Sequence, residues 1–321
     1  MALSDLHRLR MLRELAERGT LAAVAAAIGY SPSAVSQQLA VLEREAGARL
    51  VEPAGRGVRL TDAGKVLARH AVVLLNAAAT AETELANLTH EVRGRIRAVG
   101  LQSAARRLLI PALVDVARLH PLVEVEITEL ELEVALPELR LGTVDLVISD
   151  EYAGHPRPRP DGVDHHLLLR EGTRLVLPAG HPLAAHPGPV ALSSLRHEVW
   201  TSSSSGTGHH AMIIGTCRAH GGFDPDLRHR SNDADVQLEL VRSAGAVTLL
   251  PDLTLPAADP RLAVRDIAGT SLTRQLYAVT RHQALASPAL HAYVEALHRH
   301  ADPASAPEPG SLGPLRFRSR S

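Results

Sequence analysis

The sequence predicts an α/β fold in three parts: a winged helix-turn-helix, a long linker helix, and a larger part in which strands and helices alternate. Three observations support this fold class. Short helical patterns and a turn-rich stretch fill residues 5–60, and a helical pattern without proline then runs from Thr61 to about His90. Short β-branched runs separated by helical patterns occupy the remainder. The 321 residues suffice for two or three domains.

Composition excludes several classes of protein. Hydrophobic residues (45%) and charged residues (21%) are present in globular proportions, so wholesale disorder is excluded. Lys plus Arg (34) nearly cancels Asp plus Glu (35), so any electrostatic attraction to nucleic acid must be local. The lone Cys217 cannot form an intrachain disulfide, no apolar run approaches the ~18 residues of a membrane span, and the start MALSDLHRLR is charged. We therefore expect a cytoplasmic protein without membrane contact.

Two short helices joined by a glycine turn are predicted within residues 21–47. Gly29 supplies a tight turn, Ser31 can cap the second helix, and Pro32 is tolerated at its first position. The apolar positions of the first helix have amphipathic spacing: Leu21, Val24, Ala25 and Ile28. This pattern predicts a helix-turn-helix.

The second of these helices, in SPSAVSQQLAVLEREAG (31–47), has two different faces. Its apolar face carries Val35, Leu39 and Leu42. Hydroxyl and amide groups at the N-terminal end of the other face suit DNA, because glutamine can pair bidentately with adenine and a helix N-terminus favours phosphate. The predicted base or phosphate contacts are Ser33, Ser36 and Gln37, followed by Gln38. The alternative is that these are solvated surface residues.

The segment LVEPAGRGVRLT after Gly47 predicts two short strands around a turn, which form a wing that presents Arg56 and Arg59. The linker helix that follows carries apolar residues in alternating steps of four and three, the seam of a coiled coil. Its members are Leu67, Ala71, Leu74, Ala78, Ala81, Leu85 and Leu88. One helix cannot bury this seam alone, so we predict a dimer through Leu67, Leu74, Leu85 and Leu88.

The remaining chain predicts a parallel sheet of the βαβαβ kind followed by a second α/β set. The first strands are IRAVGL (96–101), VEVEITEL (123–130) and VDLVIS (144–149), with helices around 106–119 and 133–141. The second set comprises strands RLVLP (174–178), EVW (198–200), LRHRS (227–231) and AVTLL (246–250), with helices near 208–220 and 235–243. QLYAVT (275–280) and a helix over 288–301 complete it.

The stretch from 21 to 64, and especially SAVSQQL, LE, GARL and LTDAG, is similar to the LysR-type transcriptional regulators. Further along, the resemblance is carried by SAARRLLIPAL, LHP at 119–121, LRLGTVDLVI, LPAGHPLA and VTLLPDL, and it spans about 1–300. One departure is Val51-Glu52-Pro53 where the family commonly has Phe-x-Arg, which leaves Arg56 and Arg59 as the likelier basic contacts of the wing.

The resemblance implies a domain order. Residues 1–61 would form the DNA-binding domain, 62–91 the linker and dimerisation helix, and 92–301 an effector-binding domain of two Rossmann-like subdomains resembling a periplasmic binding protein. The subdomains would be I (92–162 and 268–301) and II (163–267), and the Pro/Ser-rich tail 302–321 is expected to be disordered. The implied partners are double-stranded promoter DNA, a small-molecule co-inducer, further copies of the chain as dimer or tetramer, and RNA polymerase. No cofactor is implied.

Effector contacts are expected beyond the carboxyl ends of strands. Gln102 and Ser103 follow IRAVGL, and Thr201 and Ser202 begin TSSSSGTG (201–208) after EVW. Both loops precede helices, so their hydroxyl and N–H groups would suit a carboxylate or another anion, and the resemblance puts effector contacts at the same places. Asn232 and Thr248 are second-rank candidates. The alternative is that the serine run is a flexible surface loop.

Other functions have weaker support. His165-His166 and His209-His210 lack the spacing and partners of a metal site, so no metal is expected. SSSSG is not a G-x-S-x-G nucleophile elbow, so no catalytic residues are assigned, and Cys217 lies in a helical pattern that favours the core. The competing hypothesis is a small-molecule binding protein with a degenerate DNA-binding domain.

Overall fold

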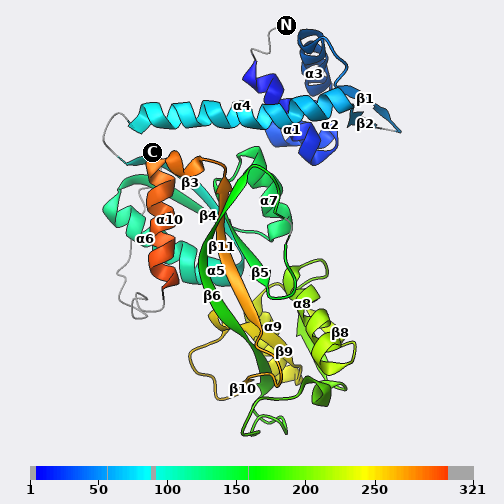
Figure 1. Cartoon of the computed structure of the whole chain (residues 1–321), viewed down its shortest axis with the longest axis vertical. Helices are drawn as coiled ribbons and strands as arrows, with labels where there is room; N and C mark the ends of the chain where they lie inside the picture. The colour runs from blue at the N-terminus through cyan, green and yellow to red at the C-terminus, as the bar shows by residue number, and fades with distance from the viewer. Residues whose placement is uncertain (1–4, 56, 88–91, 158, 303–321) are drawn as a thin grey trace.

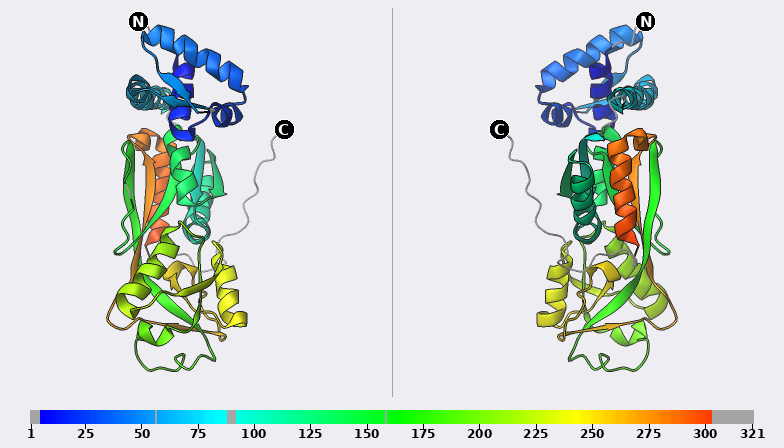
Figure 2. Two further views of the ribbon diagram at one scale, coloured as in Figure 1. Left: turned by 90° about the vertical axis from the view of Figure 1, so that its right-hand side faces the viewer. Right: turned by 90° about the vertical axis from the view of Figure 1, so that its left-hand side faces the viewer.

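The computed structural model describes residues 5–55, 57–87, 92–157 and 159–302. Arg56, Leu88 and all of the predicted tail except Asp302 lie outside these ranges. Figures 1 and 2 show an elongated molecule, with the N-terminal helices and a long helix at one end and two α/β lobes along its length.

The N-terminal domain is a helix-turn-helix followed by a two-stranded wing. Its elements are α1 (Leu6–Arg18), α2 (Leu21–Ile28), α3 (Pro32–Ala46), β1 (Val51–Ala54) and β2 (Gly57–Leu60). Gly29 ends α2 in the left-handed region at φ 71°, and the Ser31 side chain accepts a hydrogen bond from the Ala34 N–H at 3.2 Å. The predicted turn and helix start are therefore confirmed at the level of the backbone.

Helix α4 (Asp62–Asn87) packs across α1 and extends beyond it, as Figure 1 shows. Its contact face carries the small residues Gly64, Ala68 and Ala71, which are buried in the N-terminal core. None of the helices within the described ranges is both long enough and apolar enough to cross a membrane.

Two lobes share one mixed sheet after α4. Its path is β10-β6-β11-β5-β3-β4, and β9 also pairs with β6. The strands are β3 (Arg93–Gly100), β4 (Leu122–Glu129), β5 (Leu146–Tyr152), β6 (Val163–Pro178), β9 (Thr248–Pro251), β10 (Leu262–Arg265) and β11 (Thr273–Arg281). Strands β3, β4 and β5 are parallel, as predicted, whereas β11 is antiparallel to both β5 and β6.

Strand β6 joins the lobes and corrects one prediction. RLVLP (174–178) was expected as a separate short strand, but it is the second half of a strand of 16 residues. Residues 163–172 pair with β11, and residues 173–178 pair with β9 and β10. Burial does not alternate along the first half of β6, so that half carries no strand periodicity in the sequence.

The lobe around β3, β4 and β5 is called subdomain I below. Helices α6 (Ile110–Leu119) and α10 (Pro288–Ala301) pack on it with a shared core, and α7 (Leu132–Leu141) covers a second cluster. The segment before α6 is a short α5 (Gln102–Ala104) and a π-helical turn (Ala105–Leu109). Pro111 follows this turn and has no N–H for the carbonyl four residues earlier, which accounts for the widened turn.

The other lobe, subdomain II, has its own core around Trp200, Met212, Ile213 and Leu249. It contains β7 (Val199–Ser202) paired with β8 (Asp226–Arg230), helices α8 (Gly208–Thr216) and α9 (Ala234–Ala244), and a π-helical turn over Cys217–Gly221. Cys217 is buried in this core, and burial raises the pKa of its thiol to about 12, as expected of a core cysteine.

Helix α1 docks on the C-terminal end of α7, so the N-terminal domain contacts subdomain I directly. Arg18 Nη2 lies 3.0 Å from a carboxylate oxygen of Glu138, and Arg140 Nη2 lies 2.9 Å from Glu17. The buried Arg13 donates to the carbonyl oxygen of Leu141. Charged side chains from both partners therefore hold these two helices together.

Candidate nucleic-acid interface and ligand cleft

Helix α3 is held on the domain core by one face and exposes the other. Val35, Leu39 and Leu42 are at most 3% exposed, whereas the predicted contacts on the opposite side are exposed to solvent. These exposed residues, Ser33, Ser36 and Gln37, are called the reading face below. Because the core fixes the rotation of α3, the direction of the reading face is set before DNA binds.

Two other predicted DNA contacts have partners inside the protein. The Oε1 atom of Gln38 accepts a hydrogen bond from Arg8 Nε at 3.0 Å, so this half-buried side chain supports α3. In the wing, Arg59 forms an ion pair with Glu52 on the opposite strand at 2.7 Å. Arg49 is a further basic side chain that the sequence analysis did not select. It is exposed and has no ion pair within the described chain, and its position just before the wing could have marked it as a candidate DNA contact.

A cleft lies between subdomains I and II, with a cavity of about 60 Å³. Its subdomain I wall comes from the carboxyl end of β5, from α5 and from the start of α7. The other wall comes from the starts of α8 and α9 and from β9. Strand ends and helix starts therefore converge here, as in other sheets of this kind.

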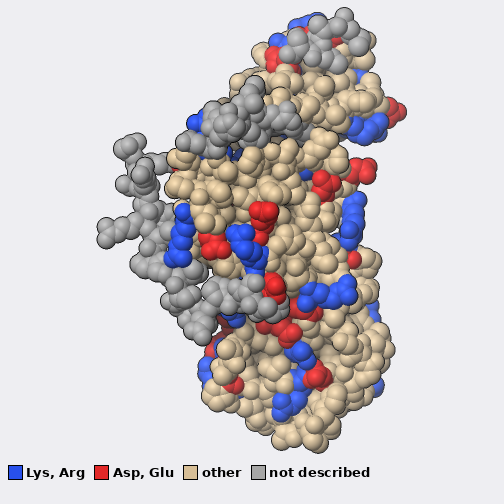
Figure 3. Space-filling view, turned by 60° about the vertical axis from the view of Figure 1, so that its left-hand side comes forward, with Lys and Arg blue, Asp and Glu red and all other residues tan. Residues whose placement is uncertain are grey.

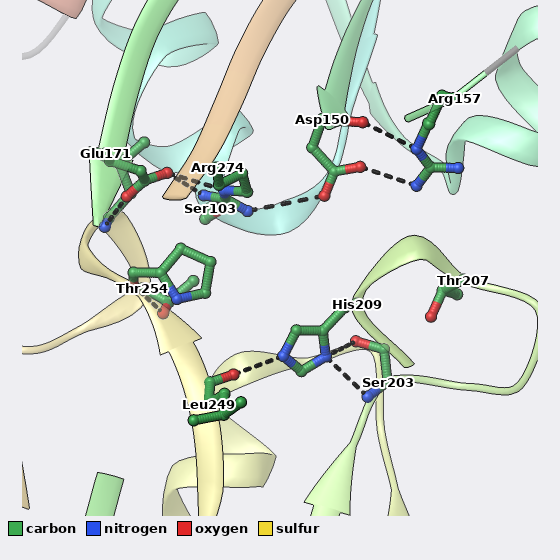
Figure 4. A network of polar contacts seen from close by, with 12 residues as sticks. Ser103, Asp150, Arg157, Glu171, Ser203, Thr207, His209, Leu249, Thr254 and Arg274 are labelled. Carbon is green, nitrogen blue, oxygen red and sulfur yellow. Dashed lines mark hydrogen bonds and ion pairs between the residues drawn. The ribbon is translucent and has the colours of Figure 1, made fainter. Parts of the chain in front are cut away.

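Arg274, on β11, is the most enclosed charge beside the cleft, with 2% of its side chain exposed. Its Nε and Nη2 atoms donate to Glu171 Oε1 at 2.8 and 2.6 Å, and Nη2 also donates to Ser103 Oγ at 3.3 Å. Figure 4 shows Arg274 between Glu171 and Asp150, and its Nη1 atom lies 4.0 Å from Asp150. Burial alone would lower the pKa of Arg274. The electrostatic effects of Tyr152, Glu171 and Asp150 outweigh burial, so the pKa of Arg274 is raised.

Arg157 occupies the rim of the cleft and is held by three hydrogen bonds. Its Nε and Nη2 atoms donate to the carbonyl oxygen and carboxylate of Asp150, each at 2.8 Å. Its Nη1 atom donates to Glu133 at 2.7 Å, at the first turn of α7. Arg157 therefore joins the end of β5 to the start of α7.

His209 fixes the serine-rich loop against β9. Its Nε2 lies 2.7 Å from the carbonyl oxygen of Leu249, and its Nδ1 lies 3.1 Å from the Ser203 N–H (Figure 4). Burial lowers the pKa of His209 to about 4, so the ring is neutral near pH 7. Because Leu249 offers only an acceptor and the Ser203 N–H only a donor, the proton must be on Nε2.

Gln102 joins the two subdomains beside the cleft. Its Nε2 donates to Asp233 Oδ1 at 2.7 Å, and its Oε1 accepts from the Ala234 N–H at 3.0 Å. Asp233 is the N-cap and Ala234 the first residue of α9, so this pair of bonds joins the start of α5 to the start of α9. Opening the cleft would break both.

The structure brings only some of the predicted effector residues to the cavity. Gln102, Ser103 and Asn232 line it. Thr201, Ser202 and Thr248 are fully buried in subdomain II and are absent from the cavity lining. The Thr248 hydroxyl donates to the Thr201 carbonyl oxygen at 2.9 Å, so it joins β9 to β7.

Sequence reasoning missed the charged side chains of the cleft. Those that line it are Glu131, Asp150, Arg157 and Arg274. Asp150 and Glu131 directly follow the predicted strands 144–149 and 123–130, so the rule that selected Ser103 could also have found them. Arg157 lies in a Pro/Gly-rich connection and Arg274 begins a late strand, so neither had a signal in the sequence.

No three His, Cys, Asp or Glu side chains gather as a metal site would require in the part of the chain that the structure describes. His209 and His210 are neighbours on α8 but serve different partners. His210 lies 3.0 Å from the Ser202 hydroxyl, whereas His209 contacts Ser203 and Leu249. Both rings therefore organise the loop.

Comparison with known proteins agrees with this arrangement. Residues 6–65 match the family model described as bacterial regulatory helix-turn-helix protein, lysR family, and residues 89–302 match the LysR substrate binding domain. The chain is 27% identical over 262 residues to the transcriptional dual regulator GltC of Bacillus subtilis, covering 81% of this chain and 85% of that protein. It is 30% identical over 278 residues to the uncharacterized HTH-type transcriptional regulator Rv2282c of Mycobacterium tuberculosis, covering 83% and 86%.

A solved structure shows the same fold. Full-length CbnR in complex with its target DNA has a TM-score of 0.53 and 22% identity, covering 92% of this chain and 99% of that chain. The LysR substrate binding domain alone spans more than half of the present sequence. The chain therefore belongs to the LysR family and is a DNA-binding transcriptional regulator of that type.

Proposed function

We propose that this regulator reads promoter DNA through the reading face of α3 and the β1–β2 wing, and that it responds to a small molecule bound between subdomains I and II. The observation that carries the proposal is the division of α3 into a buried apolar face and an exposed polar one. It would act in the cytoplasm as a dimer or tetramer, engage RNA polymerase and have no catalytic role.

Local contacts, not a general field, would supply the attraction to DNA. On the face that Figure 3 shows, basic and acidic residues are interspersed along the body of the molecule. The formal net charge is −1, so long-range steering by the whole chain is weak. The solved complex of CbnR with its target DNA shows that a protein of this fold can bind DNA, which supports the proposal. Paired reading helices would meet half-sites about 34 Å apart, or a multiple of that spacing.

Gln37→Ala is expected to weaken binding to the specific site by ~1–3 kcal/mol and to relax its sequence preference, because a bidentate base contact is lost. Arg56→Ala is the comparison, since loss of a phosphate contact should weaken all sequences evenly and reduce the salt slope by about 1. Gel shifts on specific and scrambled DNA at several salt concentrations measure both. If Gln37→Ala weakened binding to specific and scrambled DNA equally, Gln37 would make no base-specific contact.

Self-association is proposed through the exposed apolar side of α4. Val66, Val73 and Leu74 are 44%, 63% and 42% exposed. Ala71, expected in the seam, is instead buried against the chain's own core, and Leu67 is half-buried there. The side chain of Leu85 and all of Leu88 lie outside the described parts. The available face is therefore rotated slightly from the predicted seam toward Val66 and Val73.

Leu74→Glu is expected to raise the dimer dissociation constant by at least about a hundredfold. Each buried leucine contributes ~1.5–3 kcal/mol, and a symmetric dimer loses two. Analytical ultracentrifugation measures the change. Val264→Glu is the control, because Val264 is 39% exposed on β10, at the opposite end of the molecule from α4 (Figure 1). Unchanged association of Leu74→Glu would exclude this face.

The competing function is a ligand-binding protein whose DNA-binding domain has degenerated. The exposed reading face and the formed wing weigh against it. A gel shift with the DNA upstream of its own gene distinguishes the two functions. Absence of DNA binding at low salt, with and without cell extract, would favour the ligand-binding protein with a degenerate DNA-binding domain.

A further inference from the structure

Both arginines of the cleft already have carboxylate partners. Arg157 uses its Nε, Nη1 and Nη2 atoms on Asp150 and Glu133. Arg274 uses Nε and Nη2 on Glu171, and its Nη1 faces Asp150. An incoming carboxylate would have to displace one of these partners, and the displaced partner would then repel it.

Negative charge exceeds positive charge around the cavity. Two guanidinium groups, those of Arg157 and Arg274, lie among four carboxylates of the described chain. Glu131 and Asp150 line the cavity, whereas Glu133 and Glu171 lie outside its lining and pair with the two arginines. The neutral ring of His209 adds no positive charge. The formal balance near the cleft is therefore negative, which favours a cation over the anion that the loops alone suggested.

Glu131 is the carboxylate that has no partner. It lines the cavity and occupies the N-cap position of α7, yet its side chain makes no capping hydrogen bond. No hydrogen bond or ion pair to its carboxylate occurs in the described ranges. Burial, Glu133 and Asp150 raise the pKa of Glu131, and the opposing charge of Arg157 does not cancel their effect.

The cavity volume of about 60 Å³ admits only a few non-hydrogen atoms, since drug-sized ligands need roughly 300 Å³ or more. The wall opposite subdomain I offers neutral polar groups, including Thr207, Asn232 and Gln237. Leu132 and Pro251 add apolar surface. These groups suit a compact molecule with one charged end and a short polar or apolar remainder.

We propose that the cleft binds a small organic amine in its protonated form, with the ammonium group held by the carboxylate of Glu131. This ligand class rests on the proposed role of the cleft as the effector site. The match of residues 89–302 to the LysR substrate binding domain supports a ligand-binding role for this part of the chain. The ammonium would supply Glu131 with the direct positive partner that Glu133 and Asp150 already have in Arg157.

The direct test titrates the full-length protein with size-matched probes of opposite charge. Methylamine, ethanolamine and putrescine are compared with acetate, glycolate and succinate by calorimetry and by fluorescence of Trp200, the only tryptophan. The amines are expected to bind at least about tenfold more tightly than the carboxylates. Binding of the carboxylates in preference to the amines, or of neither set, would overturn the proposal.

Glu131→Gln is expected to lower affinity for the amines by about tenfold or more, because a charged hydrogen bond becomes neutral. Glu124→Gln is the matched control, since Glu124 is an exposed carboxylate on β4 that does not line the cavity. In the wild type, amine affinity should rise with pH through the pKa of Glu131, because protonation competes with the cation. The variant should lose this dependence.

Thermal melting separates a ligand contact from a structural role. With no ligand, Glu131→Gln should melt at the same temperature or higher, because it removes repulsion from Glu133 and Asp150. A lower melting temperature together with unchanged amine affinity would make Glu131 a structural residue and contradict the proposal.

Gel shifts on the same preparations distinguish this proposal from the proposed function. Protein that binds promoter DNA but none of the amines would overturn the ligand class and leave the DNA-binding role intact. Protein that binds the amines through Glu131 but no promoter DNA would support the ligand class and contradict the proposed reading of DNA.

Discussion

Glu171→Gln is expected to lower the free energy of unfolding by about 3 kcal/mol, because Arg274 would remain buried without a full counter-charge. Only 2% of the Arg274 side chain and 7% of the Glu171 side chain are exposed, so water cannot replace the lost partner. The substitution also removes an acceptor for the Leu253 N–H, now 2.6 Å from Glu171. Asp150, 4.0 Å from Arg274, keeps the loss near the low end of the range for buried pairs.

Urea denaturation followed by Trp200 fluorescence and by circular dichroism measures this loss. Glu295→Gln is the control, because the His291–Glu295 pair on α10 is more than half exposed and should contribute less than about 1 kcal/mol. If the two substitutions cost the same, the Arg274–Glu171 pair is not the buried support of the cleft that its geometry indicates.

Gly64→Ala is expected to destabilise the N-terminal domain by ~1–3 kcal/mol or more, through overpacking. A Cβ atom at Gly64 would lie 2.1 Å from the carbonyl oxygen of Leu50, which is backbone and cannot rotate away. The same junction is held by the Thr61 hydroxyl, which donates to the Arg49 carbonyl oxygen at 2.6 Å. The wing and α4 would have to separate, so specific DNA binding should fall together with stability.

Hydrogen exchange of the N-terminal domain and gel shifts measure this effect. Gly180→Ala is the control, because a Cβ at Gly180 meets nothing within 4 Å and its φ is not positive. Native stability of Gly64→Ala would show that the close approach of α4 to Leu50 relaxes easily.

The parts of the fold that depend on local chemistry could be predicted from the sequence. The turn at Gly29, the cap at Ser31 and the apolar face of α3 each involve residues within a few positions of one another. Strand β6 could not be predicted in full, because its two halves belong to different lobes and its burial follows no single period.

The cleft shows the same limit at the level of side chains. Gln102 and Ser103 could be predicted because they follow a strand and start a helix. The Arg274–Glu171 pair could not, since its members are 103 positions apart and meet only when β11 lies beside β6. The prediction of an anionic ligand considered only the hydroxyl and N–H groups of the two loops. The charges that argue for a cation come from other elements.

The start of helix α7 lines the cleft through its N-cap Glu131 and through Leu132, and its C-terminal end contacts α1 through Glu138, Arg140 and Leu141. DNA binding and the effector binding proposed for the cleft would therefore share one helix of ten residues. Any coupling it carries is reciprocal, because linkage requires each ligand to change the affinity for the other by the same factor. An effector that tightened DNA binding about tenfold would itself be bound about tenfold more tightly on DNA, and promoter occupancy would change the effector concentration to which the protein responds.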